Sequence, residues 1–208
     1  MRAYFGFEGI EACGKTTLLT RLRKGYPDFV YVREPGGTPM AEKLRTIAIS
    51  TPEDGEVMHR DTEALLFMAS RIQLLSNVVV PALNRGCTVV SDRTYYSSLA
   101  YQGAATRGEH NSDIIELVNR FIKPIAQPDF IIHLDVDVDT SIRRKHGRGQ
   151  LDAIESRERE FFEAARNHFL KHCRTLPNKH IRVDATQSPD AVYDAVVGIL
   201  KDKGVIPA

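Results

Sequence analysis

The stretch of sequence that decides the fold is Gly9-Ile10-Glu11-Ala12-Cys13-Gly14-Lys15-Thr16. It matches the pattern G-x-x-x-x-G-K-[S/T], in which glycines let the backbone curl around phosphate groups and point several N–H groups at them. Lys15 would neutralise the β- and γ-phosphates of a nucleoside triphosphate, and the Thr16 hydroxyl would bind Mg²⁺. A chance match is expected in on the order of one in a hundred chains of this length. We therefore interpret residues 9–16 as a phosphate-binding loop rather than a plain strand-to-helix turn.

The segments around this loop fit its usual setting, in which a strand leads in and a helix leads out. Short apolar runs, which we expect to be strands, occur at residues 4–7, 29–32, 87–91, 130–134 and 180–183. Helical patterns lie between and after them, at residues 15–24, 40–49, 61–84, 95–105, 112–122, 154–174 and 189–200. Continuously apolar strands that alternate with helices predict a parallel sheet covered on both faces. The expected fold is α/β, with three layers and a five-stranded parallel sheet flanked by helices, in a single domain of residues 1–208.

Composition narrows the class of protein. The formal net charge is only +1, so no overall basic field indicates a nucleic-acid or membrane partner. The three cysteines are odd in number and far apart, which suits neither a disulfide framework nor a metal site and favours a reducing compartment. No apolar run approaches the roughly 18 residues that a membrane span needs. These features predict a soluble cytoplasmic protein without nucleic-acid or membrane partners.

An acidic residue follows the expected strand at residues 87–91. Asp92 comes directly after this apolar run, and Arg93 follows it. A carboxylate at the carboxyl end of a strand reaches the crevice where open α/β sheets bind ligands. A lone Asp-Arg pair is usually a surface ion pair, but in this position we favour Asp92 as a metal ligand, together with Thr16, and Arg93 on a phosphate.

Several motifs in a fixed order resemble those of the thymidylate kinase family. They are Phe7-Glu8-Gly9-Ile10-Glu11, Gly14-Lys15-Thr16-Thr17, Arg33-Glu34-Pro35-Gly36-Gly37-Thr38, Glu63-Ala64-Leu65-Leu66-Phe67-Met68-Ala69-Ser70-Arg71, Asp92-Arg93, Ser97-Ser98-Leu99-Ala100-Tyr101-Gln102-Gly103 and Val183-Asp184-Ala185-Thr186-Gln187. The resemblance covers nearly the whole chain and implies a P-loop kinase fold. It also implies that ATP, with Mg²⁺, phosphorylates thymidine monophosphate (dTMP), and that the enzyme is a homodimer. Thr94 departs from the pattern, because the family often has an aromatic residue there.

The resemblance also implies the substrate contacts. On the ATP side it implies Gly9, Ile10, Glu11, Ala12, Cys13, Gly14, Lys15, Thr16 and Thr17, with residues 184–187 bordering the adenine. On the dTMP side it implies Glu11, Glu34, Arg45, Phe67, Ser70, Arg71, Arg93, Ser97, Ser98, Tyr101 and Gln102.

The chemistry of these side chains agrees with such roles. Phe67 and Arg71 are four residues apart and share one helix face. By resemblance Phe67 would stack on the thymine ring and Arg71, which only donates hydrogen bonds, would meet its O4 acceptor. Tyr101 would crowd the 2′ position and favour the deoxy sugar, while Arg45 and Arg93 would hold the acceptor phosphate.

Basic residues also gather in a polar stretch that we expect to be a mobile lid, at about residues 143–152. The phosphate-binding loop contains no cation besides Lys15, whereas the lid contains Arg143, Arg144, Lys145 and Arg148. This distribution resembles the bacterial-type enzymes, in which the lid supplies the catalytic arginine. We therefore expect the catalytic residues to be Lys15, Arg93, Arg148 and Arg144. A closed lid would also exclude water and limit ATP hydrolysis.

Three alternatives stay open from the sequence alone. The first is another small-molecule kinase on the same fold, such as a deoxynucleoside kinase or a different monophosphate kinase; the set of arginines suited to an acceptor that already carries phosphate argues against the nucleoside kinase. The second is a nucleotide-dependent switch or partition ATPase, which should show a second loop lysine or a basic DNA-facing stripe. The third is a binding module without turnover, which the intact Lys15, Thr16, Asp92 and Arg93 disfavour.

Overall fold

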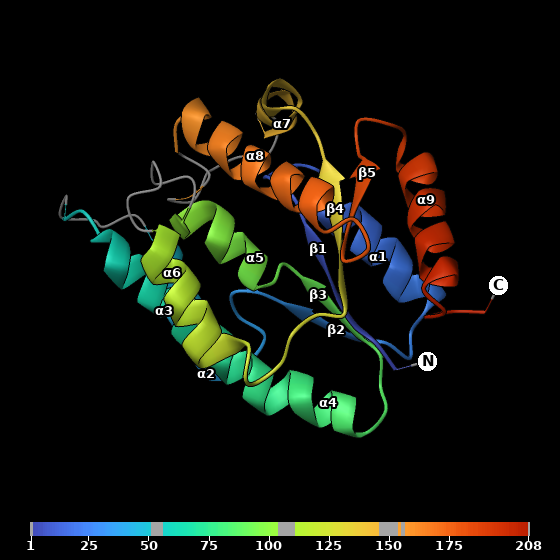
Figure 1. Ribbon diagram of the computed structural model, residues 1–208, viewed down its shortest axis with the longest axis horizontal. Coiled ribbons are helices and arrows are strands. Elements are labelled where there is room, and N and C mark those ends of the chain that lie inside the picture. The colour runs from blue at the N-terminus through green and yellow to red at the C-terminus, as the bar shows by residue number, and fades with distance from the viewer. Residues whose placement is uncertain (1, 51–55, 104–110, 146–153, 155–156, 208) are drawn as a thin grey trace.

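A computed structural model describes residues 2–50, 56–103, 111–145, 154 and 157–207 of the chain (Figure 1). Five strands form one parallel sheet in the order β2-β3-β1-β4-β5. They are β1 (Tyr4–Glu8), β2 (Val30–Arg33), β3 (Val89–Asp92), β4 (Phe130–Asp135) and β5 (His180–Asp184). Every residue of β1 and β4 is buried, which explains why these central strands are so apolar. The predicted α/β fold with a five-stranded parallel sheet is confirmed.

Helices flank the sheet on both sides (Figure 1). The α-helices are α1 (Lys15–Gly25), α2 (Pro39–Ile49), α3 (Arg60–Leu74), α4 (Val80–Asn84), α5 (Tyr95–Ser98), α6 (Asn111–Leu117), α7 (Val138–Lys145), α8 (Arg159–Thr175) and α9 (Pro189–Asp202). In the described parts of the chain, π-helical segments continue α3, α5 and α6: η1 (Leu75–Val79), η2 (Leu99–Gly103) and η4 (Val118–Ile122). In Figure 1, α1 and α9 lie together on one side of the sheet, and α2, α3 and α6 gather on the other.

The structure describes the first residues of the predicted lid. Arg143, Arg144 and Lys145 form the last turn of α7, a regular helix, instead of opening an irregular stretch. Residues 146–152 lie outside the described residues. The helix predicted from residue 154 begins at Arg159, after a turn at Ile154.

The long helical stretch corrects another expectation. Residues Arg60–Asn84 form a continuous helical run of 25 residues with a mean hydropathy of 1.4 over its most apolar window, so by length and composition this run could cross a membrane. The apolar run is interrupted at Ser70-Arg71, Gln73 and Ser76-Asn77, so the sequence shows no unbroken apolar stretch of this length. Length and composition are weak evidence, because core helices of soluble proteins pass the same test, and 44% of the window is buried inside the protein.

The last residue of β1 ties the sheet to the start of α5. Glu8 is fully buried, and its Oε1 accepts hydrogen bonds from the Thr94 amide (2.7 Å), the Thr94 hydroxyl (2.8 Å) and the Ser97 amide (3.2 Å). The Ser97 hydroxyl donates to Oε2 at 2.6 Å. Thr94 also caps α5 by accepting from the Tyr96 amide. The Thr94 hydroxyl therefore satisfies both a buried carboxylate and a helix end.

The methyl group of Thr94 explains a glycine in β1. A Cβ added at Gly6 would overlap Thr94 Cγ2, and Ile131 Cδ1 would be only 3.4 Å away. We predict that Gly6→Ala lowers the free energy of unfolding by about 1–3 kcal/mol, the usual cost of overpacking a core.

The double variant Gly6→Ala/Thr94→Ser should recover a large part of this loss in urea unfolding, because serine keeps the hydroxyl and lacks the methyl. Thr94→Ser alone is the control. If Gly6→Ala unfolds at the same urea concentration as the unsubstituted protein, the close contact is not a constraint on the fold.

Candidate active site

A cavity at the carboxyl end of the sheet collects most of the predicted site residues. It is lined by Glu11, Ala12, Cys13, Gly14, Lys15, Thr16, Glu34, Arg45, Phe67, Arg71, Asp92, Arg93, Ser97, Ser98, Tyr101 and Gln102, all of which the sequence had indicated. Arg33, Pro35, Ile49 and Ile154 also line it. Pro35 and Arg33 flank a predicted residue in the same motif, whereas nothing in the sequence marks Ile49 or Ile154.

The phosphate-binding loop has the backbone that its glycines predict. Gly9 and Gly14 have φ angles of 148° and 100°, which side-chain-bearing residues rarely adopt. A Cβ on Gly9 would also lie 2.5 Å from the Leu134 carbonyl oxygen. Lys15 is buried, and its Nζ donates to the Gly9 carbonyl at 3.0 Å and approaches Cys13 Sγ at 3.4 Å. The loop therefore holds its one cation inside the curl of the backbone.

Arg93 connects this loop to the opposite wall of the cavity. Its guanidinium donates to the Gly9 carbonyl (3.1 Å), to the Ser97 hydroxyl (3.1 Å) and to Glu11 Oε1 (2.7 Å). The Tyr101 hydroxyl donates to the other Glu11 oxygen at 3.1 Å, and burial raises the pKa of Tyr101 well above its usual value. These contacts bring Arg93 and its neighbour Asp92 to the point where the two walls meet.

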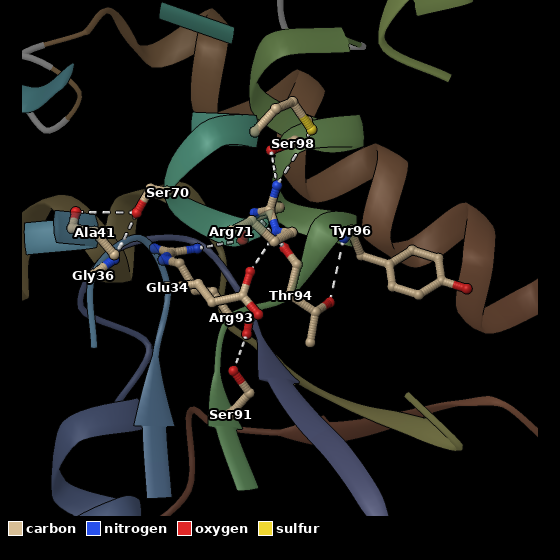
Figure 2. Close-up of polar contacts among 12 residues, drawn as sticks. Glu34, Gly36, Ala41, Ser70, Arg71, Ser91, Arg93, Thr94, Tyr96 and Ser98 are labelled. Carbon is tan, nitrogen blue, oxygen red and sulfur yellow. Dashed lines mark hydrogen bonds and ion pairs between the residues drawn. The ribbon is translucent and has the colours of Figure 1, made fainter. Parts of the chain in front are cut away.

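Arg71 organises the wall formed by α3 and α5 (Figure 2). Arg71 is only 2% exposed, and its Nε forms a buried ion pair with Glu34. Its Nη1 donates to Ser98 Oγ at 3.0 Å, and its Nη2 donates to the Thr94 carbonyl at 3.1 Å. Burial raises the pKa of Glu34, and the charge and hydrogen bond of Arg71 oppose that rise. Phe67 lies one helical turn before Arg71 and lines the same cavity.

Two residues of this wall support the turn that carries Glu34. Ser70 is fully buried, accepts from the Gly36 amide at 3.0 Å and donates to the Ala41 carbonyl at 3.1 Å. It does not line the cavity, so the structure places it behind the wall instead of at the predicted dTMP contact surface. Arg45 lines the cavity from α2, and its Nη1 donates to the Pro35 carbonyl at 3.2 Å.

A second cavity lies on the other side of the phosphate-binding loop. It is lined by Ala12, Cys13, Gly14, Thr17, Leu18, Arg144, Ala185, Gln187, Pro189 and Val192. The Arg144 guanidinium donates to the Ala185 carbonyl at 3.1 Å and to the Ala12 carbonyl at 3.4 Å. These contacts join α7, the loop and the segment after β5, where we expect the adenine. Arg148, the other predicted catalytic residue of the lid, lies outside the described residues.

A phosphate-binding loop between β1 and α1 of a parallel sheet, beside a cavity rich in arginine, defines a P-loop nucleotide kinase. The chain matches the thymidylate kinase family over residues 7–196. It is 42% identical over 188 residues to a thymidylate kinase of Pseudomonas fluorescens (strain Pf0-1), with 88% of each chain covered. It is 39% identical over 197 residues to the thymidylate kinase of Francisella tularensis subsp. holarctica (strain OSU18), which covers 93% of this chain and 92% of the relative. The chain belongs to the thymidylate kinase family.

The buried Arg71–Glu34 pair gives a prediction about stability. Arg71→Met should lower the free energy of unfolding by about 3–5 kcal/mol, because it leaves a carboxylate buried without its cation. The loss should shrink as the pH falls, because burial favours the protonated Glu34 and a protonated Glu34 carries no charge.

The double variant Arg71→Met/Glu34→Gln should unfold at a higher urea concentration than Arg71→Met, since it removes both charges. Equal stability of the single and double variants at neutral pH would show that Glu34 does not depend on Arg71.

Proposed function

We propose that this chain transfers the γ-phosphoryl group of ATP to dTMP and produces ADP and thymidine diphosphate. The main support for the proposal is that the phosphate-binding loop lines the same cavity as Phe67, Arg71 and Tyr101, which lie on the opposite wall. An oxygen of the dTMP phosphate attacks the γ-phosphorus, and the bond from that phosphorus to the β–γ bridging oxygen breaks. Most of the catalysis is positioning and neutralisation of charge.

The acceptor side of the cavity supplies both shape and charge. Phe67 would stack on the thymine ring, and Arg71 would donate to its O4 from a guanidinium that Glu34 and Ser98 already orient. Ser97, Ser98, Tyr101 and Gln102 would line the rest of the pocket, with Tyr101 against the 2′ position. Glu34 and Ser70 would support this wall from the turn and from α3.

Cationic side chains would surround the point where the phosphate of dTMP meets the phosphates of ATP. Arg45 and Arg93 would hold the dTMP phosphate, and Lys15 would neutralise the β- and γ-phosphates. Arg148 and Arg144 would stabilise the transferring group from a lid at about residues 143–152. We place this machinery in one domain of residues 1–208.

The residues also fit a magnesium ion. Thr16 and Asp92 offer a hydroxyl and a carboxylate to the cavity that contains Lys15. Within the described residues no group of three or more His, Cys, Asp or Glu forms a metal cage. Such a sparse set suits Mg²⁺, which keeps several waters and binds through one or two protein oxygens and the substrate phosphates. When bound, the ion would neutralise phosphate charge.

We also propose that the enzyme is a homodimer in the cytoplasm. Large apolar side chains are exposed on α2, α3, α6 and η4: Met40, Ile47, Leu65, Ile115 and Phe121. A second copy would cover this face and the exposed part of the long helix. Cys13, Cys87 and Cys173 are free thiols, as expected in a reducing compartment.

The function is tested by a coupled assay of ADP release with ATP and Mg²⁺. We expect the highest kcat/KM with dTMP, compared with the other nucleoside monophosphates and with thymidine, and thymidine diphosphate as the product. Lys15→Met should lower kcat by about 10²–10³-fold with every acceptor, because it removes charge neutralisation in the transition state.

Activity with thymidine instead of dTMP would indicate a nucleoside kinase. Inactivity with every acceptor, while ATP still binds, would indicate a switch or a binding module.

The dimer is tested by light scattering during size-exclusion chromatography. The unsubstituted chain should elute with about twice the mass of one chain, which is 23.3 kDa. Leu65→Glu/Phe121→Glu should yield monomers, because charges buried in an apolar interface are unfavourable. Leu176→Glu, at an exposed apolar residue after α8, is the matched control and should stay dimeric. A monomeric unsubstituted protein would refute the dimer.

A further inference from the structure

An ion pair outside the predicted site joins α3 to the segment before α8. Arg157 Nη2 lies 2.5 Å from Glu63 Oε2, and the other Glu63 oxygen, Oε1, accepts from Gln102 Nε2 at 2.9 Å. Glu63 and Gln102 are each 7% exposed, whereas the Arg157 side chain is 39% exposed. One carboxylate therefore connects a partly exposed arginine to a buried amide.

This connection ends at the wall of the cavity. Gln102 lines the cavity directly, and so does Ile154, whose carbonyl accepts from the Arg157 amide at 3.1 Å. Glu63 lies one helical turn before Phe67, on the same face of α3. The Arg157–Glu63 pair thus lies directly behind the surface that meets the base in the proposed function.

The chemistry of the pair fixes the orientation of the Gln102 amide. A carboxylate only accepts hydrogen bonds, so the NH₂ end of the amide faces Glu63 and the carbonyl end faces away from it. A buried carboxylate is costly without a cation and good hydrogen bonds. Arg157 supplies the cation beside the carboxylate that holds Gln102.

Arg157 also contacts an aromatic pair that leads to the sugar pocket. Its guanidinium carbon lies 5.1 Å from the centroid of the Phe161 ring. The Phe161 ring is stacked on Tyr101, with centroids 5.6 Å apart and planes 29° apart. The same arginine therefore supports Gln102 through Glu63 and Tyr101 through Phe161.

We propose that Arg157 is a positioning residue for the acceptor nucleotide, which acts through Glu63 on the Gln102 amide and through Phe161 on Tyr101. The inference rests on the proposed function, since it assigns these side chains to the pocket for dTMP. Within the described residues Arg157 itself contacts Glu63, Ile154 and Phe161, none of which belongs to the phosphate-binding loop, so ATP binding should depend on Arg157 less than dTMP binding does.

The test measures steady-state kinetics of Arg157→Gln with dTMP and ATP varied separately, and dTMP binding by calorimetry without ATP. We expect the KM for dTMP and its dissociation constant to rise about five- to tenfold, the range for loss of one partly exposed ion pair plus an ordered amide. The KM for ATP should change less than about twofold, because Arg157 reaches the loop only indirectly, through Phe161 and Tyr101.

Further variants separate positioning from a general loss of structure. Arg157→Lys keeps a cation for Glu63 and should restore most of the affinity for dTMP. Arg159→Gln is the matched control, because this arginine begins α8 and, within the described residues, its ion pairs are with the exposed Asp139 and Glu163; both KM values should stay unchanged. Adding Arg157→Gln to Glu63→Gln should weaken dTMP binding by a smaller factor than Arg157→Gln alone does, since only the route through Phe161 is then left to remove.

Two results would overturn the inference. One is an Arg157→Gln enzyme whose KM and dissociation constant for dTMP lie within twofold of those of the unsubstituted enzyme. The other is an equal rise of both KM values, which would indicate a structural defect. If the unsubstituted enzyme neither binds nor phosphorylates dTMP, the proposed function fails instead.

Discussion

The rest of the site depends on the burial of one carboxylate, that of Glu8. A fully buried carboxylate is strongly unfavourable unless donors surround it, and here Thr94 and Ser97 supply four hydrogen bonds. Glu8 is followed directly by Gly9, the first residue of the phosphate-binding loop, while Ser97 belongs to the wall of the acceptor pocket. The need to satisfy Glu8 therefore fixes the distance between the two halves of the active site.

Acidic side chains at neighbouring strand ends are likewise satisfied by donors from other segments. Glu11 after β1 pairs with Arg93 after β3, and Glu34 after β2 pairs with Arg71. Because the strands are parallel, their carboxyl ends lie at one edge of the sheet, so acids and arginines from distant parts of the chain meet there. Each acid orients an arginine before any phosphate or base arrives. The cavity is still cationic in a chain of net charge +1, because among the described residues its lining holds five cations (Lys15, Arg33, Arg45, Arg71 and Arg93) and three acids (Glu11, Glu34 and Asp92).

Sequence patterns predicted those features that depend on local order. The five strands could be predicted because buried parallel strands are continuously apolar. The position of the cavity could be predicted because the carboxyl ends of parallel strands, such as the end at Asp92, lie at one edge of the sheet. Features that depend on long-range packing could not be found in this way. The Arg157–Glu63 pair joins residues 94 positions apart. His180 packs between Tyr96 and His172, and burial lowers its pKa to about 3, but its sequence position gives no sign of this.

The helix that follows Asp92 explains how base and phosphate recognition are combined. Ser97 and Tyr101 lie four residues apart and both contact Arg93, while Tyr101 also reaches the Gly9 carbonyl of the loop. Ser98 and Gln102 form the adjoining stripe and turn toward α3, where they meet Arg71 and Glu63. One short helical segment, completed by the π-helix η2, thus contacts Arg93, which we propose to hold the acceptor phosphate, with one stripe, and α3, which we propose to hold the base, with the next. Because a displacement of this segment would change both sets of contacts, the proposed function links the fit of the base against α3 to the position of Arg93.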